Sequence, residues 1–182
     1  MASARTGVAN APTGTLLALA ALACVVTLAL TGAIAGFFYA YSSTVMRGFD
    51  AIEPHQAIAA MQGINANVRN AVFAPAFFGT PLAAVVTGVI FLVLRWKSSA
   101  ILMFLAAAAY ILGAFLPTLL INVPMNEELA LVGLPREAES AALIWSSYST
   151  RWTWWNSLRA VFSTTSLIFV GCAILAAGRR LQ

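Results

Sequence analysis

Four long apolar runs constrain this sequence more than any other feature. They cover residues 15–41, 71–94, 98–121 and 157–177, and within the last of them Arg159 is the one charged residue. Each run is long enough to cross the roughly 30 Å of hydrocarbon in a bilayer, which takes about 20 helical residues. Because lipid offers the backbone no hydrogen-bond partners, such segments must be helical. The sequence therefore predicts an all-α integral membrane four-helix bundle, with short helices in two extracytoplasmic loops.

The composition excludes an ordinary soluble domain. The 182 residues are 61% hydrophobic and 9% charged, and the mean hydropathy is +0.87. Soluble domains carry about 25% charged residues. A cleaved secretory signal is the alternative for the first run, because Ala33-Ile34-Ala35 mimics a cleavage site. The positive region before that run is only Arg5, and the apolar run continues past the site, so we expect it to be retained.

The distribution of basic residues predicts the orientation in the membrane. Both termini and the 95–97 link share one side, which holds five basic residues and no acid, whereas the other side holds all six acids and five arginines. Basic residues concentrate on the cytoplasmic side. We therefore expect a multi-pass protein of the cell membrane with both termini cytoplasmic. The high pI of about 9.6 reflects this topology rather than a nucleic-acid partner.

The domain organisation is simple. Residues 1–14 are small, polar and punctuated by glycine and proline, which predicts a disordered cytoplasmic tail. Residues 15–182 form the single predicted domain. The oligomeric state is left open by the sequence. Gly32 and Gly36 have the spacing of close helix packing, and we expect that packing to be within the bundle rather than between chains.

Two polar loops on the acidic side carry nearly all the candidate chemistry. In the loop of residues 42–70, Pro54 suits a helix start, and a stripe of three- and four-residue spacing predicts a helix running directly into the 71–94 run. In the loop of residues 122–156, Pro124 predicts a new helix start. From about Glu137 the pattern is helical into the last run. Prolines at 75, 81 and 117 predict kinks and a cup-like outer half.

Amide and guanidinium groups recur at the helix ends on this same side. The members of this set are Asn65, Arg69, Asn122, Asn126, Asn156 and Arg159. Polar groups at membrane depth are costly, so they normally face the bundle interior. They predict either a hydrogen-bonded knot that holds the helices together or a pocket whose donors hold an oxyanion or carbonyl. The sequence favours neither over the other.

Aromatic residues lead into the last run, in the segment "RWTWWNSLRAVFS". A helix there places Trp152, Asn156 and Arg159 on one face, and Tyr148 lies one turn earlier. Many of these tryptophans suit the aromatic belt at a membrane interface. The alternative is an aromatic pocket wall, in which Tyr148, Trp152 and Trp155 would contact a ligand.

The acid–base candidates are few. His55 is the only histidine, and a solvated loop position is the simpler interpretation for it, with a catalytic base as the alternative. With two cysteines, one histidine and no Cys/His cluster, the sequence does not predict a structural metal or haem site.

Four blocks together resemble the DUF1772 or anthrone-oxygenase-like family of small four-span membrane proteins. In chain order they read "GFFYAYSSTVMRGFD", "AMQGINANVRNAVF", "NVPMNEEL" and "WTWWNSLR". The resemblance implies an oxygenase that converts a polyketide anthrone to an anthraquinone with dioxygen, without a metal, flavin or other cofactor. The family's recurring polar positions would fall on Asn65, Asn122, Pro124, Asn126, Trp152, Asn156 and Arg159.

This resemblance suggests roles for the candidate residues. His55 would act as the base, Arg159 and Asn156 would stabilise the enolate, and the aromatic residues would stack on a hydrophobic aromatic small molecule. The alternative is a non-enzymatic membrane protein that binds a quinone-like or lipidic molecule or serves as an assembly partner. Transport is disfavoured, because the cytoplasmic half offers no matching polar groups.

Overall fold

The computed structural model describes residues 14–133 and 137–182, which form helices and turns without a strand. The described elements are α1 (Gly14–Ala40), η1 (Tyr41–Val45), α2 (Met46–Asp50), α3 (Pro54–Asn67), α4 (Phe73–Val93), α5 (Lys97–Tyr110), η2 (Ile111–Phe115), η3 (Thr118–Asn122), α6 (Val123–Leu131) and α7 (Ala138–Gly178). The all-α prediction is confirmed. Of the predicted tail, residues 1–14, all but Gly14 lie outside the described residues.

Four helical stretches are long and apolar enough to cross a membrane: Gly14–Asp50, Phe73–Val93, Lys97–Leu131 and Ala138–Gly178. Large apolar side chains such as Leu22, Leu82 and Ile168 are more than half exposed on their outer surfaces. In water such a surface would be unstable, whereas lipid solvates it. The chain is therefore a multi-pass membrane protein.

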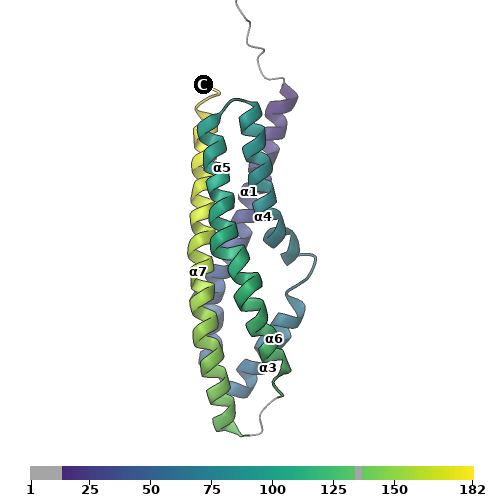
Figure 1. Ribbon diagram of the computed structural model, residues 1–182, viewed down its shortest axis with the longest axis vertical. Coiled ribbons are helices and arrows are strands. Elements are labelled where there is room, and N and C mark those ends of the chain that lie inside the picture. Colours follow the sequence, from purple (N-terminus) through teal and green to yellow (C-terminus); the bar gives the residue numbers. More distant parts are fainter. Residues whose placement is uncertain (1–13, 134–136) are drawn as a thin grey trace, which may run out of the picture.

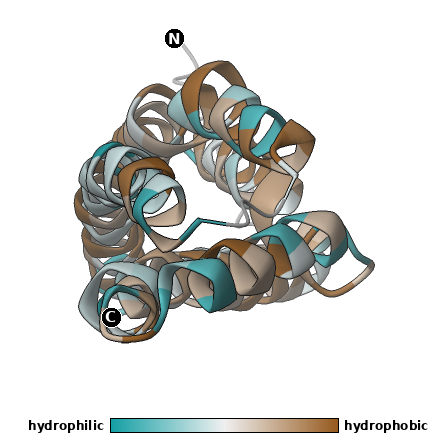
Figure 2. Cartoon of the chain, turned by 90° about the horizontal axis from the view of Figure 1, so that it is seen from below, coloured by the Kyte–Doolittle hydropathy of each residue, from teal (hydrophilic) through white to brown (hydrophobic). Residues whose placement is uncertain are grey.

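The long helices form a closed antiparallel ring. Neighbours in sequence pack as neighbours in space, α1 on α4, α4 on α5 and α5 on α7, and α7 returns to α1. Figure 1 shows the ring along its length, with α3 and α6 gathered at one end. Viewed along the axis, the helices surround a common interior and are predominantly hydrophobic (Figure 2). This is the up-down-up-down arrangement that short connections favour.

The two ends of the ring differ in construction. We call the end with Gly14, the 94–96 turn and Gly178 the terminal half, and the end with α3 and α6 the loop half. In the terminal half, α4 ends at a tight turn in which Trp96 N–H donates to Phe91 O at 2.8 Å and Arg95 has a positive φ of 60°. That pairing caps the helix, and α5 begins at once.

The loop half departs from the predicted helix boundaries at residues 68–72. The predicted continuous helix into the 71–94 run is wrong, because α3 ends at Asn67 and α4 begins at Phe73. The Asn70 side chain explains the break: its Oδ1 accepts hydrogen bonds from the N–H groups of Val72 (2.9 Å) and Phe73 (3.0 Å). An asparagine that caps the next helix in this way competes with continuing the previous one. Pro54 does open α3, as predicted.

Pro124 lies in the first turn of α6, as predicted, but α6 does not follow a loop, because the helical stretch from Lys97 continues through it to Leu131. Two π-helical turns, η2 and η3, lie in this stretch, and η3 ends just before α6. In η3, Val123 N–H donates to Thr118 O, one residue farther back than in an α-helix. This wider turn lets the chain pass a proline without ending the helix. The predicted helix from about Glu137 into the last run is confirmed by α7.

The expected packing role of the Gly32 and Gly36 pair is not found. A Cβ atom added at either glycine would meet no atom within 4 Å, so neither lies against another helix of the bundle. The close approach is made by Gly113 instead, where an added Cβ would collide with the Phe162 ring. Gly113 thus allows η2 and α7 to pack tightly next to the loop half.

Candidate functional site

A cavity of about 320 Å³ lies in the loop half, with walls from α1, η1, α3, α4, η3, α6 and α7. This volume falls in the range of small-molecule sites. Seven of the ten predicted site residues line it: Asn65, Arg69, Asn122, Asn126, Trp152, Asn156 and Arg159. The structure therefore brings together polar residues from segments as distant in sequence as α3 and α7.

Arg159 is the most unusual group in the cavity wall. It is 3% exposed, and its guanidinium lies over the rings of Phe38 (4.7 Å) and Trp152 (5.1 Å). Its Nη1 donates to Thr118 Oγ1 at 3.1 Å, whereas Nε has no partner among the described residues. No carboxylate pairs with it in the part of the chain that the structure describes. A buried charge without a counter-ion is expensive, so this site is suited to an anion.

Asn156 holds that arginine in place. Its Oδ1 accepts from Arg159 Nη2 at 3.0 Å, and its Nδ2 donates to Phe38 O and to Ser42 Oγ, both at 2.7 Å. Both ends of this amide are therefore occupied, and α1 and η1 are tied to α7 through it. The geometry makes Asn156 a positioning residue for Arg159 rather than a direct contact to a ligand.

A second hydrogen-bonded group centres on Asn126. Its Oδ1 accepts from Tyr148 Oη at 2.8 Å and from Trp152 Nε1 at 2.9 Å. Asn65 Nδ2 in turn approaches Tyr148 Oη at 3.4 Å. With its oxygen held by two donors, the amide of Asn126 has a fixed orientation. Tyr148 supports the cavity from behind and is not part of its lining.

Asn122 lies between these two groups and belongs to neither. It is 1% exposed and lines the cavity, yet neither its Nδ2 nor its Oδ1 has a hydrogen-bond partner among the described residues. Buried side-chain amides are normally paired.

The cavity opens toward the outside of the bundle along two edges. Phe78 and Leu119 line it while being 56% and 40% exposed, which places one opening on the lipid-facing side of α4 and η3. At another edge Arg69 forms an ion pair with Glu127 at 3.4 Å, with both side chains 64% exposed. Such an exposed pair contributes little stability. It does link the turn after α3 to α6.

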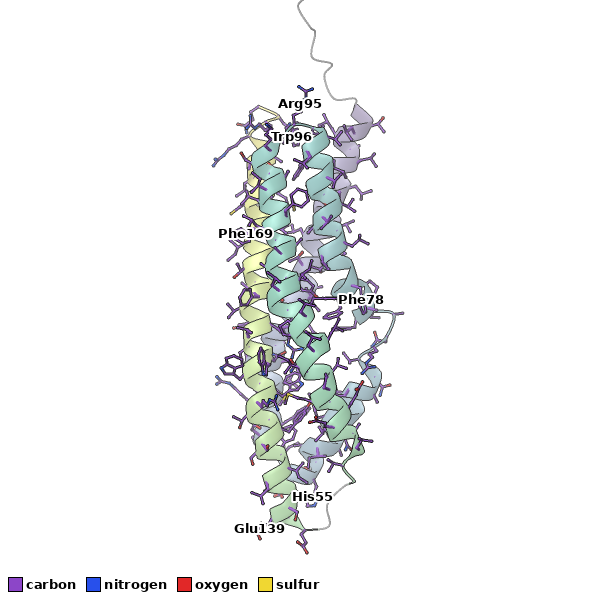
Figure 3. All side chains as sticks on the ribbon, in the orientation of Figure 1. His55, Phe78, Arg95, Trp96, Glu139 and Phe169 are labelled. Atoms are coloured by element: carbon purple, nitrogen blue, oxygen red, sulfur yellow. The ribbon has the colours of Figure 1, made fainter. Side chains whose placement is uncertain are left out.

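Two predicted site residues lie away from the cavity. His55, near the start of α3, is not in the lining, and Figure 3 shows it at the far end of the loop half, whereas Phe78 lies near the middle of the bundle. A general base must reach within hydrogen-bond distance of the proton it removes. The structure therefore does not bring His55 to the position that the base hypothesis requires. Trp155 packs edge-on against Trp154 at 4.7 Å, outside the lining.

Several aromatic wall residues were missed by sequence reasoning. Phe37, Phe38 and Tyr41 come from α1 and η1, and Phe73 and Phe77 come from α4. Phe73 and Phe77 are stacked at 5.4 Å with an interplanar angle of 18°. In an apolar run nothing distinguishes an inward phenylalanine from a lipid-facing one.

The fold and the cavity define a class: a four-span membrane protein with an aromatic cavity around a buried arginine. A family model described as "Anthrone oxygenase" matches residues 70–169, more than half of the chain, and the chain belongs to this family. The match includes Asn122, Asn126, Trp152, Asn156 and Arg159. No curated protein and no solved structure matches the chain. Membership indicates an oxygenase-type function.

Proposed function

We propose that this protein is a membrane oxygenase that uses dioxygen to convert an anthrone-type substrate to the corresponding quinone. The observation that carries the proposal is the buried guanidinium of Arg159, which faces an aromatic cavity without a carboxylate partner among the described residues. Loss of a benzylic proton from an anthrone leaves an enolate, which is a flat aromatic anion. The cavity offers such an anion both a cation and aromatic surfaces.

The oxidation balances without a further reactant. Removal of one benzylic proton gives the enolate, which transfers one electron to dioxygen and forms superoxide. The two radicals combine at the benzylic carbon to give a peroxide. The peroxide takes back the first proton, and loss of the remaining benzylic proton then cleaves the O–O bond, forms the second carbonyl and releases hydroxide, which that second proton converts to water. One dioxygen is consumed for each quinone and each water formed.

Arg159 acts on the first of these steps. A fixed positive charge in a site shielded from water favours the enolate over the neutral anthrone. Asn156 and Thr118 fix two sides of the guanidinium, so little reorganisation is needed when the charge develops. With the anion favoured in this way, water at the Arg69 edge of the cavity serves as the proton acceptor.

The surroundings supply both reactants. Phe78 and Leu119 open the cavity to the lipid-facing side, so a hydrophobic tricyclic substrate has direct access from the bilayer. Dioxygen also partitions into hydrocarbon. The protein needs no water-filled channel for either reactant, and its partners in this proposal are the lipid bilayer and the aromatic substrate.

The test is dioxygen uptake and quinone formation by the purified protein given an anthrone. Arg159→Leu is expected to lower the catalysed rate by about 100-fold or more while the protein stays folded. Arg151→Leu is the matched control, because Arg151 is exposed on the same helix and does not line the cavity. His55→Gln is expected to retain activity. Equal turnover by wild type and Arg159→Leu would remove Arg159 from the reaction.

The same preparation tests the alternative, a binding protein without activity. Stoichiometric binding of an anthraquinone, with dioxygen uptake no faster than in protein-free detergent, would establish binding without catalysis.

We further propose that the terminal half faces the cytoplasm in the cell membrane, since Arg95, Lys97, Arg179 and Arg180 lie there. Labelling of a cysteine introduced beside Arg180 from the outside of intact cells would contradict that orientation.

A further inference from the structure

The cavity wall contains one buried amide, that of Asn122, for which the described residues supply no hydrogen-bond partner at either end. Asn122 is 1% exposed, so bulk water does not reach its side chain freely. A buried amide in this state forfeits the hydrogen bonds that it made with water in the unfolded chain. Such a cost is normally avoided in a folded protein, and it points to a ligand that pairs with the amide.

The amide of Asn122 lies beside the guanidinium of Arg159. That guanidinium donates to Thr118, four residues before Asn122, and its central carbon lies 5.1 Å from the centroid of the Trp152 ring. Trp152 in turn donates to Asn126, four residues after Asn122. Both neighbours of Asn122 in the cavity wall are thus bonded to the Arg159–Trp152 pair. Because Arg159 Nε also lacks a partner in the described part of the chain, this corner of the cavity suits an oxygen anion.

The two ends of the amide define the chemistry of the missing partner. It must accept from Nδ2 and donate to Oδ1. Superoxide accepts, and the positive charge of Arg159 attracts it. Of the organic species in the proposed oxidation, the hydroperoxide is the one with both functions on a single oxygen, because its terminal oxygen carries a proton as well as lone pairs. The anthrone carbonyl, the enolate and the quinone only accept.

We propose that Asn122 is a further catalytic residue, which binds the oxygen unit derived from dioxygen between its reduction to superoxide and its release as water. The proposal rests on the proposed oxygenase function and assigns the oxygen subsite of that cavity. Nδ2 donates to superoxide and holds it beside the substrate radical until the two combine.

The same amide then acts on the hydroperoxide. Its Oδ1 accepts from the hydroperoxide O–H, and its Nδ2 donates to the terminal oxygen. When the benzylic C–H bond breaks, its electron pair forms the second carbonyl and the O–O bond breaks, so the terminal oxygen leaves with the O–O electron pair as hydroxide. A donor at that oxygen stabilises the charge as it develops. The benzylic proton converts the hydroxide to water.

Loss of this subsite has a chemical signature of its own. If superoxide is not held, it leaves the cavity before it combines with the substrate radical. Two superoxide ions and two protons then give hydrogen peroxide and dioxygen, while two substrate radicals couple through their benzylic carbons to a dianthrone. This side reaction consumes two anthrones and one dioxygen for each dianthrone and each hydrogen peroxide formed. Product composition therefore reports the oxygen subsite separately from the rate.

The experiment gives unsubstituted anthrone to wild type and to Asn122→Leu, and measures dioxygen, anthraquinone, dianthrone and hydrogen peroxide, each corrected for the protein-free reaction. Wild type is expected to form about one quinone for each dioxygen. The variant is expected to form about tenfold or more hydrogen peroxide and dianthrone per quinone, since a hydrogen bond to an anion is among the stronger ones. A slower reaction with an unchanged product ratio would overturn the proposal, because Asn122 would then act only on enolate formation.

Stability and a second variant separate catalysis from a structural role. Asn122→Leu removes an amide that has no partner within the described residues, so the ligand-free variant is expected to melt no lower than wild type. A clear fall in Tm would identify a structural hydrogen bond and overturn the proposal. Asn122→Asp keeps the side-chain shape but loses the N–H donors, and it is expected to release hydrogen peroxide as well. Asn67→Leu is the control, because Asn67 carries an exposed amide outside the cavity, and its product ratio is expected to match wild type.

Equilibrium binding keeps the two proposals distinguishable. The probes are cumene hydroperoxide and cumyl methyl ether, which have nearly the same shape and differ in the O–H group. Tighter binding of the hydroperoxide by wild type, lost in Asn122→Leu, together with no dioxygen uptake, would retain the hydroperoxide subsite and reject the oxygenase. Turnover by wild type with equal binding of both probes would retain the oxygenase and reject the role of Asn122.

Discussion

The terminal half and the loop half both bury polar side chains, but of different kinds. In the terminal half and the middle of the bundle they are hydroxyl groups, such as those of Thr27, Thr87 and Ser166. In the loop half they are mainly amides and a guanidinium, those of Asn122, Asn156 and Arg159. A hydroxyl group is satisfied by one hydrogen bond, whereas an amide or a guanidinium needs several, and this difference separates a structural region from a site.

The threonine hydroxyl groups of α1 are satisfied within their own helix, and Ser166 Oγ makes a single hydrogen bond, to Ala106 O of α5 at 2.8 Å. Thr27 Oγ1 donates to Ala23 O at 2.8 Å and Thr31 Oγ1 donates to Thr27 O at 2.7 Å, each one turn back. The contact between Thr27 and Thr87 at 2.9 Å is additional to that bond. Such residues cost little in a membrane helix and need no ligand.

An amide or guanidinium has more donors and acceptors than its own helix can satisfy. Asn156 therefore reaches α1 and η1, and Arg159 reaches η3. Each such contact depends on the correct packing of several helices. Asn122 and Arg159 Nε have no partner in the part of the chain that the structure describes, and at such positions a ligand can supply one. The loop half is thus both the more demanding half to assemble and the one with capacity for a substrate.

The largest effect that would test this contrast is expected for Asn156→Leu. The substitution leaves Phe38 O and Arg159 Nη2 without their partner, and the free energy of unfolding should fall by about 3 kcal/mol. Turnover should fall with it, because Arg159 loses its orientation. Thermal unfolding in detergent, alongside the activity assay, measures both. Stability equal to wild type would show that the loop half does not depend on this amide.

An intermediate effect is expected for Tyr148→Phe. Asn126 Oδ1 loses one donor and keeps the other, Trp152 Nε1. The expected cost is about 1 kcal/mol in unfolding free energy. Because the remaining bond still orients Asn126, kcat/KM should fall by less than about tenfold. A loss of activity as large as that of Arg159→Leu would instead place the phenol in the reaction.

The smallest effect is expected in the terminal half, for Thr87→Val. Thr27 keeps its bond to Ala23 O, so the cost should be near the average of about 0.6 kcal/mol for hydrogen bonds between membrane helices. Activity with the anthrone should be unchanged. A loss of turnover here would break the division between the halves, because the hydroxyl would then act on a distant site.

Much of the candidate site followed from the sequence, because a polar residue in an apolar setting is conspicuous. Asn65, Asn122, Asn126, Asn156 and Arg159 were identified in this way. Their partners were not, since hydrogen bonds from α7 to Phe38 O or to Ser42 join residues more than a hundred positions apart. His55 was selected for the acid–base chemistry of its side chain alone, and that chemistry does not determine where the residue lies relative to the cavity.

The sequence by itself determined the four spans, the helical state and the end of the bundle at which polar groups gather. These follow from the lengths of the apolar runs and the cost of exposing backbone or charge to lipid. Only the tertiary structure decided the break at Asn70, the π-helical turns before Pro124, the distance of His55 and the open face of Gly32. It also decided that Asn156 is fully bonded while Asn122 has no hydrogen-bond partner among the described residues. The physical reason is that hydropathy acts residue by residue, whereas a hydrogen bond between helices requires both partners in place.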